Sequence, residues 1–245
     1  MNQTRHPPPF TPHASRSNGR RVEPELLDTL PPDDPRALRS RRDLRRVNAW
    51  MGNHGIMARA LMENTTAPPA ELLELGAGDG QFLLRVARKL SMCGRFMAPA
   101  ATLLDRQPVV SADTLAAFAK IGWRAQAVVA DVTAQPLPPA QIVIANLFLH
   151  HFEDARLGQL LAAISRRAEL FAAVEPRRFR HPYFCGELLR CIGCNFVTRH
   201  DAAASVRAGF LGGELSALWP DGRNWRLTEG RAGLFSHLFV AKKIS

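Results

Sequence analysis

The stretch Glu71-Leu-Leu-Glu-Leu-Gly-Ala-Gly-Asp-Gly80, followed directly by Gln81-Phe-Leu-Leu-Arg-Val-Ala-Arg-Lys-Leu90, decides the fold class of this chain. Its apolar start predicts a buried strand, its three glycines predict a tight turn, and the amphipathic segment after them predicts a helix. Glycine lets the backbone approach a ligand closely because it has no Cβ. The first N–H groups of the helix have no partner within it. The stretch therefore predicts a strand, loop and helix that bind a nucleotide-like ligand.

The spacing of the glycines separates the possible ligands. Gly76, Gly78 and Gly80 do not match the G-x-G-x-x-G of a dinucleotide site, and no Gly-Lys-Ser/Thr of a P-loop follows. Glu74 completes the pattern acid-x-Gly-x-Gly-x-Gly, which resembles the first motif of class I S-adenosylmethionine (SAM) methyltransferases. The resemblance implies that Glu74, Gly76, Ala77, Gly78 and Gly80 bind SAM. A purely structural glycine turn is the alternative.

Acids end the next two apolar segments, Ala101–Asp105 and Ala125–Asp131. In the resembled family the first of these acids binds the ribose hydroxyls, which predicts that Asp105 and its neighbour Arg106 contact the cofactor. The second acid contacts the adenine amino group and the residue after it packs on the ring, which predicts these roles for Asp131 and Val132. For each acid the alternative is a cap of a helix or loop.

The fourth apolar segment, Gln141–Asn146, runs into Leu-Phe-Leu-His150-His151. Open α/β folds bind ligands at the carboxyl ends of their strands, so Asn146 is predicted to contact the cofactor there. Histidine titrates near neutral pH and can act as a general base for a hydroxyl. Members of the resembled family that act on small molecules often carry two histidines here. We expect one of the pair to face the cleft and the other to be structural.

The fifth segment, Leu170–Pro176, also ends in an acid, Glu175. A carboxylate beside an imidazole fixes its tautomer and raises its basicity. In similar natural-product O-methyltransferases an acid at this position cooperates with the histidines. His150, His151 and Glu175 are therefore the predicted catalytic residues. The alternative for Glu175 is a salt bridge to Arg177 or Arg178.

The type of methyl acceptor is predicted partly by absences from the sequence. The segment after Asn146 lacks the two prolines typical of amino-methylating enzymes, and too few carboxylates are present for a metal-dependent site, so no metal is predicted. Arg41–Asn53 and Ser205–Phe210 resemble a bacterial subgroup associated with type III polyketide synthase gene clusters. These features favour metal-free, histidine-assisted O-methylation of a phenolic or polyketide-type small molecule. A non-catalytic SAM-binding accessory protein and an RNA-directed methyltransferase are the alternatives.

Net charge and cysteine spacing allow two further types of partner. The formal net charge of +10 is compatible with nucleic-acid binding, but the arginines are spread along the chain without interleaved aromatic residues. No specific nucleic-acid partner is therefore expected. Cys185, Cys191 and Cys194 offer only one C-x-x-C pair, so small buried residues are favoured over a zinc site. The pattern leaves the oligomeric state open.

The domain organisation follows from the composition along the chain. We predict a disordered tail over 1–20, an N-terminal helical lid over 21–66, and a methyltransferase domain over 67–245 with a substrate-side insertion at 181–220. The N-terminus has no apolar signal-peptide segment, and no run of 18 apolar residues occurs. A cytoplasmic location without a membrane span is expected.

Strand and helix patterns alternate from 71 to 176, which predicts a parallel sheet with helices on both faces. A terminal hairpin is predicted from two apolar segments around Gly230-Arg-Ala-Gly233. A short helix is expected over 201–210, with Asp201 as its N-cap. The resemblance implies an α/β, Rossmann-like fold whose seven-stranded, mostly parallel sheet has the order 3-2-1-4-5-7-6.

Overall fold

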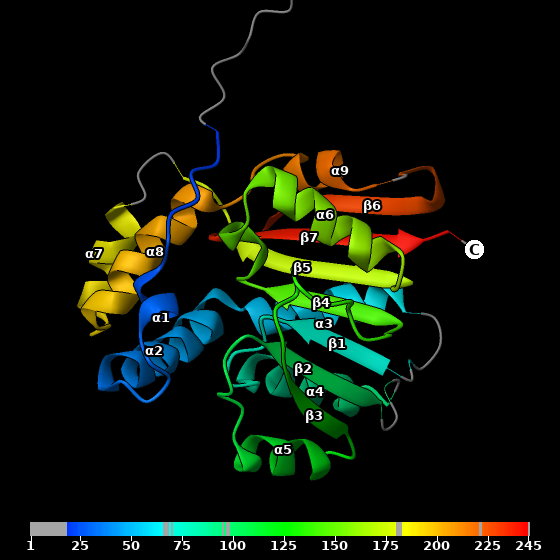
Figure 1. The fold of residues 1–245 in the computed structure, drawn as a ribbon, viewed down its shortest axis with the longest axis horizontal. Coiled ribbons are helices and arrows are strands. Elements are labelled where there is room, and N and C mark those ends of the chain that lie inside the picture. Colours follow the sequence, from blue (N-terminus) through cyan, green and yellow to red (C-terminus); the bar gives the residue numbers. More distant parts are fainter. Residues whose placement is uncertain are drawn as a thin grey trace, which may run out of the picture.

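A computed structural model describes residues 19–65, 69, 71–94, 96, 99–179, 183–220 and 222–244, with backbone alone for 183–186. One seven-stranded sheet has the order β3-β2-β1-β4-β5-β7-β6, which confirms the predicted topology (Figure 1). The pairings of the first five strands are parallel, and β7 is antiparallel to both of its neighbours. The strands are β1 (Glu71–Leu75), β2 (Ala100–Asp105), β3 (Arg124–Val129), β4 (Ile142–Asn146), β5 (Leu170–Pro176), β6 (Trp225–Ala232) and β7 (Ser236–Lys243).

Helices cover both faces of this sheet, as predicted. One face packs against α3 (Asn53–Asn64), α4 (Gln81–Met92) and α5 (Ala112–Ala119), and the other against α6 (Asp154–Ser165) and α9 (Glu214–Leu218). Every residue of β4 and β5 is buried, because strands between two helical layers have no solvent face. These strands therefore read in the sequence as continuous apolar runs that end in Asn146 and Glu175.

A separate lobe of helices lies beyond the carboxyl ends of the parallel strands (Figure 1). It consists of α1 (Leu26–Thr29), α2 (Pro35–Met51), α7 (Tyr183–Cys191) and α8 (Phe196–Ala208). Ser40 of α2 and Thr198 of α8 share a buried 2.9 Å hydrogen bond, which joins these helices. Within the predicted helical lid over 21–66, α2 and α3 are divided at Gly52, whose φ of 72° is left-handed. The first of these helices lies in the lobe, whereas α3 packs into the core against α4 and β5.

The terminal hairpin differs in detail from the predicted one. The turn lies between Ala232 and Ser236, not at 230–233, because Gly230 continues the ladder and pairs with Leu238. Gly233 takes the left-handed turn conformation, with φ of 72°. Two glycines three residues apart thus do not locate the turn, since only the second adopts a conformation that requires glycine.

The helix predicted over 201–210 begins earlier than expected. α8 starts at Phe196, and the side chain of Asn195 caps it by accepting a 2.9 Å hydrogen bond from the Thr198 N–H. Asp201 is therefore not an N-cap of its own helix. Its buried carboxylate instead accepts from the N–H groups of Leu26 and Leu27, at 2.8 and 3.0 Å, and so caps α1.

The segment before α1 is anchored to the rest of the chain through Arg20. Its guanidinium lies 4.1 Å from the centre of the Phe210 ring and donates to Asp154 and to the Phe152 carbonyl oxygen, at 2.6 and 2.9 Å. Glu23 accepts from Arg207 at 2.5 Å. Residues 1–18 lie outside the described part, so the predicted disorder of the tail stays a prediction for them.

Two further sequence predictions concern membranes and cysteines. Within the described ranges, no helix is both long enough and apolar enough to cross a membrane. Cys191 is exposed and Cys194 is buried, and both are free thiols. The side chain of Cys185 lies outside the described residues, so the zinc alternative is not addressed at that position.

Candidate active site

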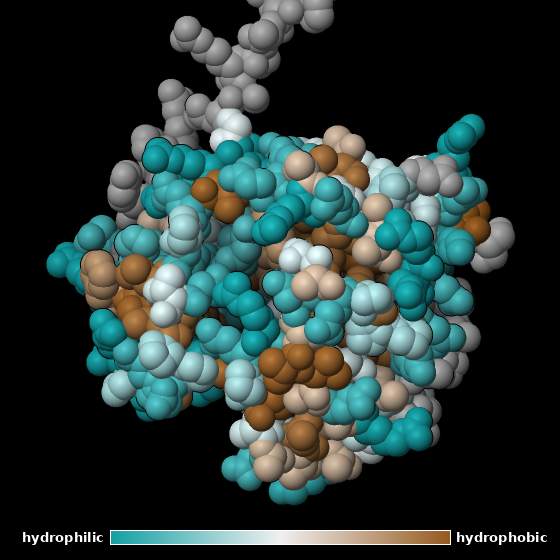
Figure 2. All heavy atoms as spheres, in the orientation of Figure 1, coloured by the Kyte–Doolittle hydropathy of each residue, from teal (hydrophilic) through white to brown (hydrophobic). Residues whose placement is uncertain are grey.

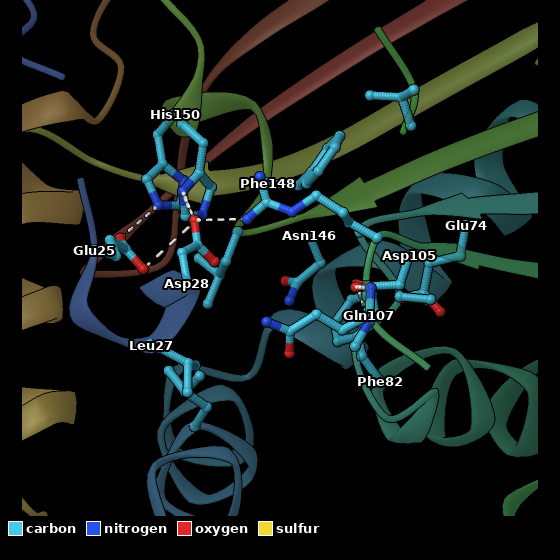
Figure 3. A pocket seen from close by; sticks show the side chains of 18 of the residues that line it. Glu25, Leu27, Asp28, Glu74, Phe82, Asp105, Gln107, Asn146, Phe148 and His150 are labelled. Atoms are coloured by element: carbon cyan, nitrogen blue, oxygen red, sulfur yellow. Dashed lines mark hydrogen bonds and ion pairs between the residues drawn. The ribbon is translucent and has the colours of Figure 1, made fainter. Parts of the chain in front are cut away.

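A cleft of about 540 Å³ lies between the glycine loop, the carboxyl ends of the parallel strands and the helical lobe (Figure 3). Glu74 and Asp105 lie at one end of the view, Glu25 and His150 at the other, and Asn146 between them. Every predicted site residue except Gly80 and Glu175 lines the cleft. These two lie directly behind it, Gly80 at the start of α4 and Glu175 against His150.

The three glycines of the loop are required for different reasons. A Cβ on Gly76 would lie 2.2 Å from the Phe148 ring, and one on Gly80 would lie 2.9 Å from the Leu103 side chain, so packing alone requires glycine at both positions. A Cβ on Gly78 would meet nothing within 4 Å, although its φ of 54° is also left-handed. Ala77 is buried and donates its N–H to the Leu104 carbonyl oxygen. Only Gly78 leaves open space that a ligand can fill.

Glu74 is a buried carboxyl group with one oxygen unused. Its side chain is 1% exposed, and Oε2 has no hydrogen-bond partner among the described residues. Burial, together with the charges of Asp79 and Asp105, raises its pKa well above the usual value. A buried polar atom without a partner costs free energy, so this oxygen indicates a donor that binds from the cleft.

Asp105 ends β2 beside the loop. Its Oδ2 accepts from the Gly78 N–H and its Oδ1 from the Gln107 N–H, both at 2.8 Å. The carboxylate thus fixes the loop conformation and still lines the cleft. Gln107 also lines the cleft and was not predicted from the sequence.

The predicted adenine end of the cleft is open. Asp131 accepts from both the N–H and the hydroxyl of Thr133, at 2.8 and 2.7 Å, and these bonds lower the pKa of its carboxyl group. This is the loop cap that the sequence left open as an alternative. Val132 packs partly against the core, and Arg106 is mostly exposed, 3.9 Å from Asp28.

Asn146 belongs to a cluster of buried and half-buried amides at the end of β4. Its Nδ2 donates to Asn48 at 3.1 Å, and its Oδ1 accepts from Asn53 at 3.2 Å. Asn53 also donates to Asn48 and accepts from Ser236. Asn146 is therefore held rigidly in the floor of the cleft, and α2 and α3 are joined to the sheet at that point.

The two histidines occupy a short 3₁₀ turn, Leu149–His151, that Glu175 stabilises. Glu175 accepts from the N–H groups of Phe148 and Leu149 at 3.0 and 2.9 Å, and from His150 Nδ1 at 2.8 Å. The alternative salt bridge to Arg177 or Arg178 is not found among the described residues, where Glu175 pairs with His150 and Arg178 pairs with Glu214 at 2.6 Å. Glu175 thus contacts a histidine, as predicted, but it is fully buried behind the cleft.

His150 is enclosed between two carboxylates. Its Nε2 lies 3.3 Å from Glu25, and its side chain is 3% exposed. Burial alone would lower its pKa, but the hydrogen bonds to Glu175 and Glu25 raise it to about 9. Burial opposes ionisation of Glu25 as well, yet bonds from His150 and Ser205 and the nearby His151 lower its pKa to about 2. His150 is therefore an imidazolium at neutral pH.

The stabilising effect of this pair has a defined pH range. His150 contributes stability fully below its ordinary pKa of 6.5, and this contribution is lost as pH rises through about 9. Glu25 contributes stability above its ordinary pKa of 4.5, and this contribution is lost as pH falls through about 2. Both contributions are complete between these two ordinary values.

His151 has the opposite character. Its side chain is 24% exposed, and burial and the charge of His150 lower its pKa. Its Nε2 lies 3.9 Å from Glu25 and its Nδ1 3.6 Å from Asp28, both beyond hydrogen-bond distance. A neutral imidazole with an unused lone pair thus faces the cleft, with two carboxylates placed to stabilise its protonated form.

Three side chains of the cleft could also hold a metal ion. One ligand atom from each of Glu25, His150 and His151 lies within 4.8 Å of the other two, and transition metals accept carboxylate and imidazole ligands. A proton on His150 already supplies positive charge between Glu25 and Glu175. The absence of a metal at this site therefore stays a prediction, and dialysis against a chelator tests it.

Sequence reasoning missed several residues of the cleft. Glu25 and Asp28 lie in a short segment that reads only as an apolar anchor between prolines. His54 of α3 also lines the cleft, and its buried Nδ1 has no partner among the described residues. No local pattern identifies these side chains, because their proximity to the cleft arises from contacts between distant segments.

Comparison with known proteins supports the fold. No family model and no curated protein sequence matches this chain. The plantazolicin methyltransferase BpumL in complex with SAH is 13% identical over 86% of this chain and 92% of its own, with a TM-score of 0.59. An O-methyltransferase family protein from Burkholderia thailandensis is 13% identical, over 87% of this chain and 61% of its own, with a TM-score of 0.57. The chain therefore has the fold of class I methyltransferases.

Proposed function

We propose that this protein is a SAM-dependent methyltransferase that transfers a methyl group to a hydroxyl group of a small molecule. The acceptor that we propose is a phenolic or polyketide-type compound. The observation that carries the proposal is the unpartnered, buried Glu74 Oε2 beside the open position above Gly78. SAM carries an ammonium group that fits such a carboxylate. Solved structures of this fold in complex with SAH or SAM support the choice of cofactor.

The other residues of the cleft fit the same cofactor. Asp105 offers a carboxylate for ribose hydroxyls next to the loop, and Asp131 and Val132 line the region proposed for the adenine. Arg106 and Asn146 remain proposed contacts. When bound, SAM supplies a methyl group on a sulfonium, which an acceptor oxygen can attack directly. The protein then has to position the acceptor and remove its proton.

We propose that His151 is the base that accepts the proton of the acceptor's hydroxyl group. Its imidazole is neutral and faces the cleft, and the positive charge it gains would be stabilised by Glu25 and Asp28. His150 is protonated and has both ring nitrogens engaged by Glu25 and Glu175, so its proposed role is to position its neighbour. The two imidazole rings lie 4.3 Å apart.

Protonation of Glu74 should control cofactor affinity. Because its pKa is raised, the free protein must lose a proton from Glu74 when the ammonium group binds, so SAM affinity should fall as pH falls. Glu74→Gln should weaken SAM binding by about 10- to 100-fold, the value of one hydrogen bond to a charged group, and should flatten the pH dependence. Calorimetry across the acidic to neutral range measures both.

Glu71→Gln is the matched control, because Glu71 lies on the same strand with its side chain exposed. It should leave SAM affinity and its pH dependence unchanged. A steep pH dependence that persists in Glu74→Gln would contradict the assignment of Glu74 to the ammonium group.

Incubation with labelled SAM and separate panels of phenols, amines and transfer RNA tests the reaction itself. We expect label on the phenols, and only weak binding to RNA that is lost as salt rises, because the net charge of +10 attracts any polyanion. Salt-resistant binding and labelling of one RNA would favour the RNA-directed alternative. Tight SAM binding without transfer to any acceptor would favour the non-catalytic accessory protein.

A further inference from the structure

A second, smaller cavity of about 90 Å³ lies beside the cleft, within the helical lobe. Its wall is mainly apolar and comes from α2, α7, α8 and the ends of the strands. The apolar side chains that line it are Leu27, Leu44, Val47, Trp50, Met51, Leu147, Pro176, Phe179, Leu188, Leu189, Ala202, Val206 and Phe235. Nothing in the reaction proposed above uses this cavity.

The few polar groups in the wall are already bonded to the protein. Ser40 and Thr198 bond to each other at 2.9 Å, and Asp201 accepts from two N–H groups of α1. Ser205 donates to the Asp201 carbonyl oxygen at 2.8 Å and also bonds to Glu25. Among the described residues of the wall, a ligand would thus find no unused polar side chain to pair with. A buried polar group on the ligand would lose its bonds to water, so the bound part must be apolar.

The cavity and the cleft share a wall. Five residues line both the cavity and the cleft, namely Glu25, Leu27, Leu44, Leu147 and Ser205. Among the described residues Leu147 is the one residue other than glycine with a positive φ, at 51°. A left-handed conformation is strained for leucine, and such strain is often retained where a side chain must point to a functional site. The two spaces are therefore adjacent, and a molecule that occupies both must pass between these shared side chains.

The size of the cavity limits what it accepts. A cavity of about 150 Å³ with a leucine, isoleucine and phenylalanine lining accepts benzene. This one, at about 90 Å³, is too small for a ring but has room for a short chain. Trp50 is 55% exposed and lies 4.9 Å from Phe235, ring centre to ring centre, so aromatic side chains extend the apolar lining to the surface. Figure 2 shows hydrophobic surface over this lobe on a mainly hydrophilic face.

We propose that this cavity binds an unbranched alkyl chain of the acceptor, while the head group that carries the hydroxyl lies in the cleft beside His151. The position of the head group rests on the function proposed above, but chain binding does not. The acceptor is therefore an alkylated compound, and the cavity selects it by chain length.

A series of 4-alkylphenols, from phenol itself to 4-octylphenol, tests the proposal by calorimetry with S-adenosylhomocysteine present. Each added methylene should tighten binding about fourfold, equivalent to about 0.8 kcal/mol, until the cavity is filled. Because binding is measured without turnover, the result is independent of whether the protein methylates these probes.

Two variants should change the chain-length dependence in opposite directions. Ala202→Leu fills part of the cavity, so it should shorten the longest chain that still gains affinity and leave phenol itself unaffected. Met51→Ala enlarges the cavity, so the gain should continue to longer chains. Ala116→Leu is the control, because Ala116 is an exposed residue of α5 that lines neither cavity.

Thermal unfolding checks that each variant is folded, and if one of the two does not fold, the result with the other decides. Affinity that does not depend on chain length in the wild-type protein would overturn the proposal. So would a dependence that both Ala202→Leu and Met51→Ala leave unchanged. Chain-length dependence in a protein that fails to bind SAM would overturn only the proposed function.

Discussion

Gly78→Val is expected to abolish SAM binding, with a loss of affinity of at least about 100-fold by calorimetry. The reason is steric, because the added side chain would enter the open space above the loop, where no protein atom lies within 4 Å of the Cβ position. A loss of this size corresponds to about 2.7 kcal/mol or more, and a blocked site can readily exceed it. The Gly78 N–H also bonds to Asp105, so a shift of the loop would displace that carboxylate.

The backbone strain of this substitution has a matched control. Gly122 also has a positive φ, of 80°, and a Cβ there would likewise meet nothing within 4 Å, but it does not line the cleft. Gly122→Val should therefore destabilise the fold by a similar roughly 1–2 kcal/mol and leave SAM affinity unchanged. Undiminished SAM affinity in folded Gly78→Val would remove the basis for placing the cofactor at this loop.

His151→Ala is expected to lower kcat by about 10²- to 10⁴-fold while SAM affinity stays close to that of the wild type. His151 is the neutral imidazole that faces the cleft beside Glu25 and Asp28, so its removal takes away the proposed base. The loss should shrink along a series of phenols of decreasing pKa, because an acceptor that is already ionised needs no base. Turnover of each phenol with each variant measures the effect.

His150→Ala should produce a different result. It removes a buried imidazolium and leaves the carboxylates of Glu25 and Glu175 without its positive charge, which should cost about 3–5 kcal/mol of unfolding free energy. Dialysis of the wild-type protein against a chelator should leave kcat unchanged if a proton, not a metal ion, lies between these groups. Full turnover in both single variants and in the double variant would show that the histidines are structural. Loss of activity on chelation, restored by one metal, would show that they bind that metal.

Much of this fold follows from local sequence patterns. Apolar runs predicted the strands, glycine spacing predicted the loop, and acids at the strand ends predicted which side chains approach the cleft. Such signals are reliable because strand and helix periodicities depend on near neighbours in the chain. The strand order was predicted only through the family resemblance. The hairpin turn and the start of α8 were placed wrongly, since Gly230 and Asp201 carry turn and cap signals that distant partners override.

The division between the two histidines was decided by tertiary structure alone. His150 and His151 are adjacent and chemically identical in the sequence, and no pattern shows which one is buried. Glu25 lies 125 residues before His150, and Arg20 helps to anchor the segment that carries Glu25 by packing on Phe210. Burial and charge pairing depend on which distant segments meet. These contacts give the two imidazoles opposite pKa shifts, and they arise only when the whole chain is folded.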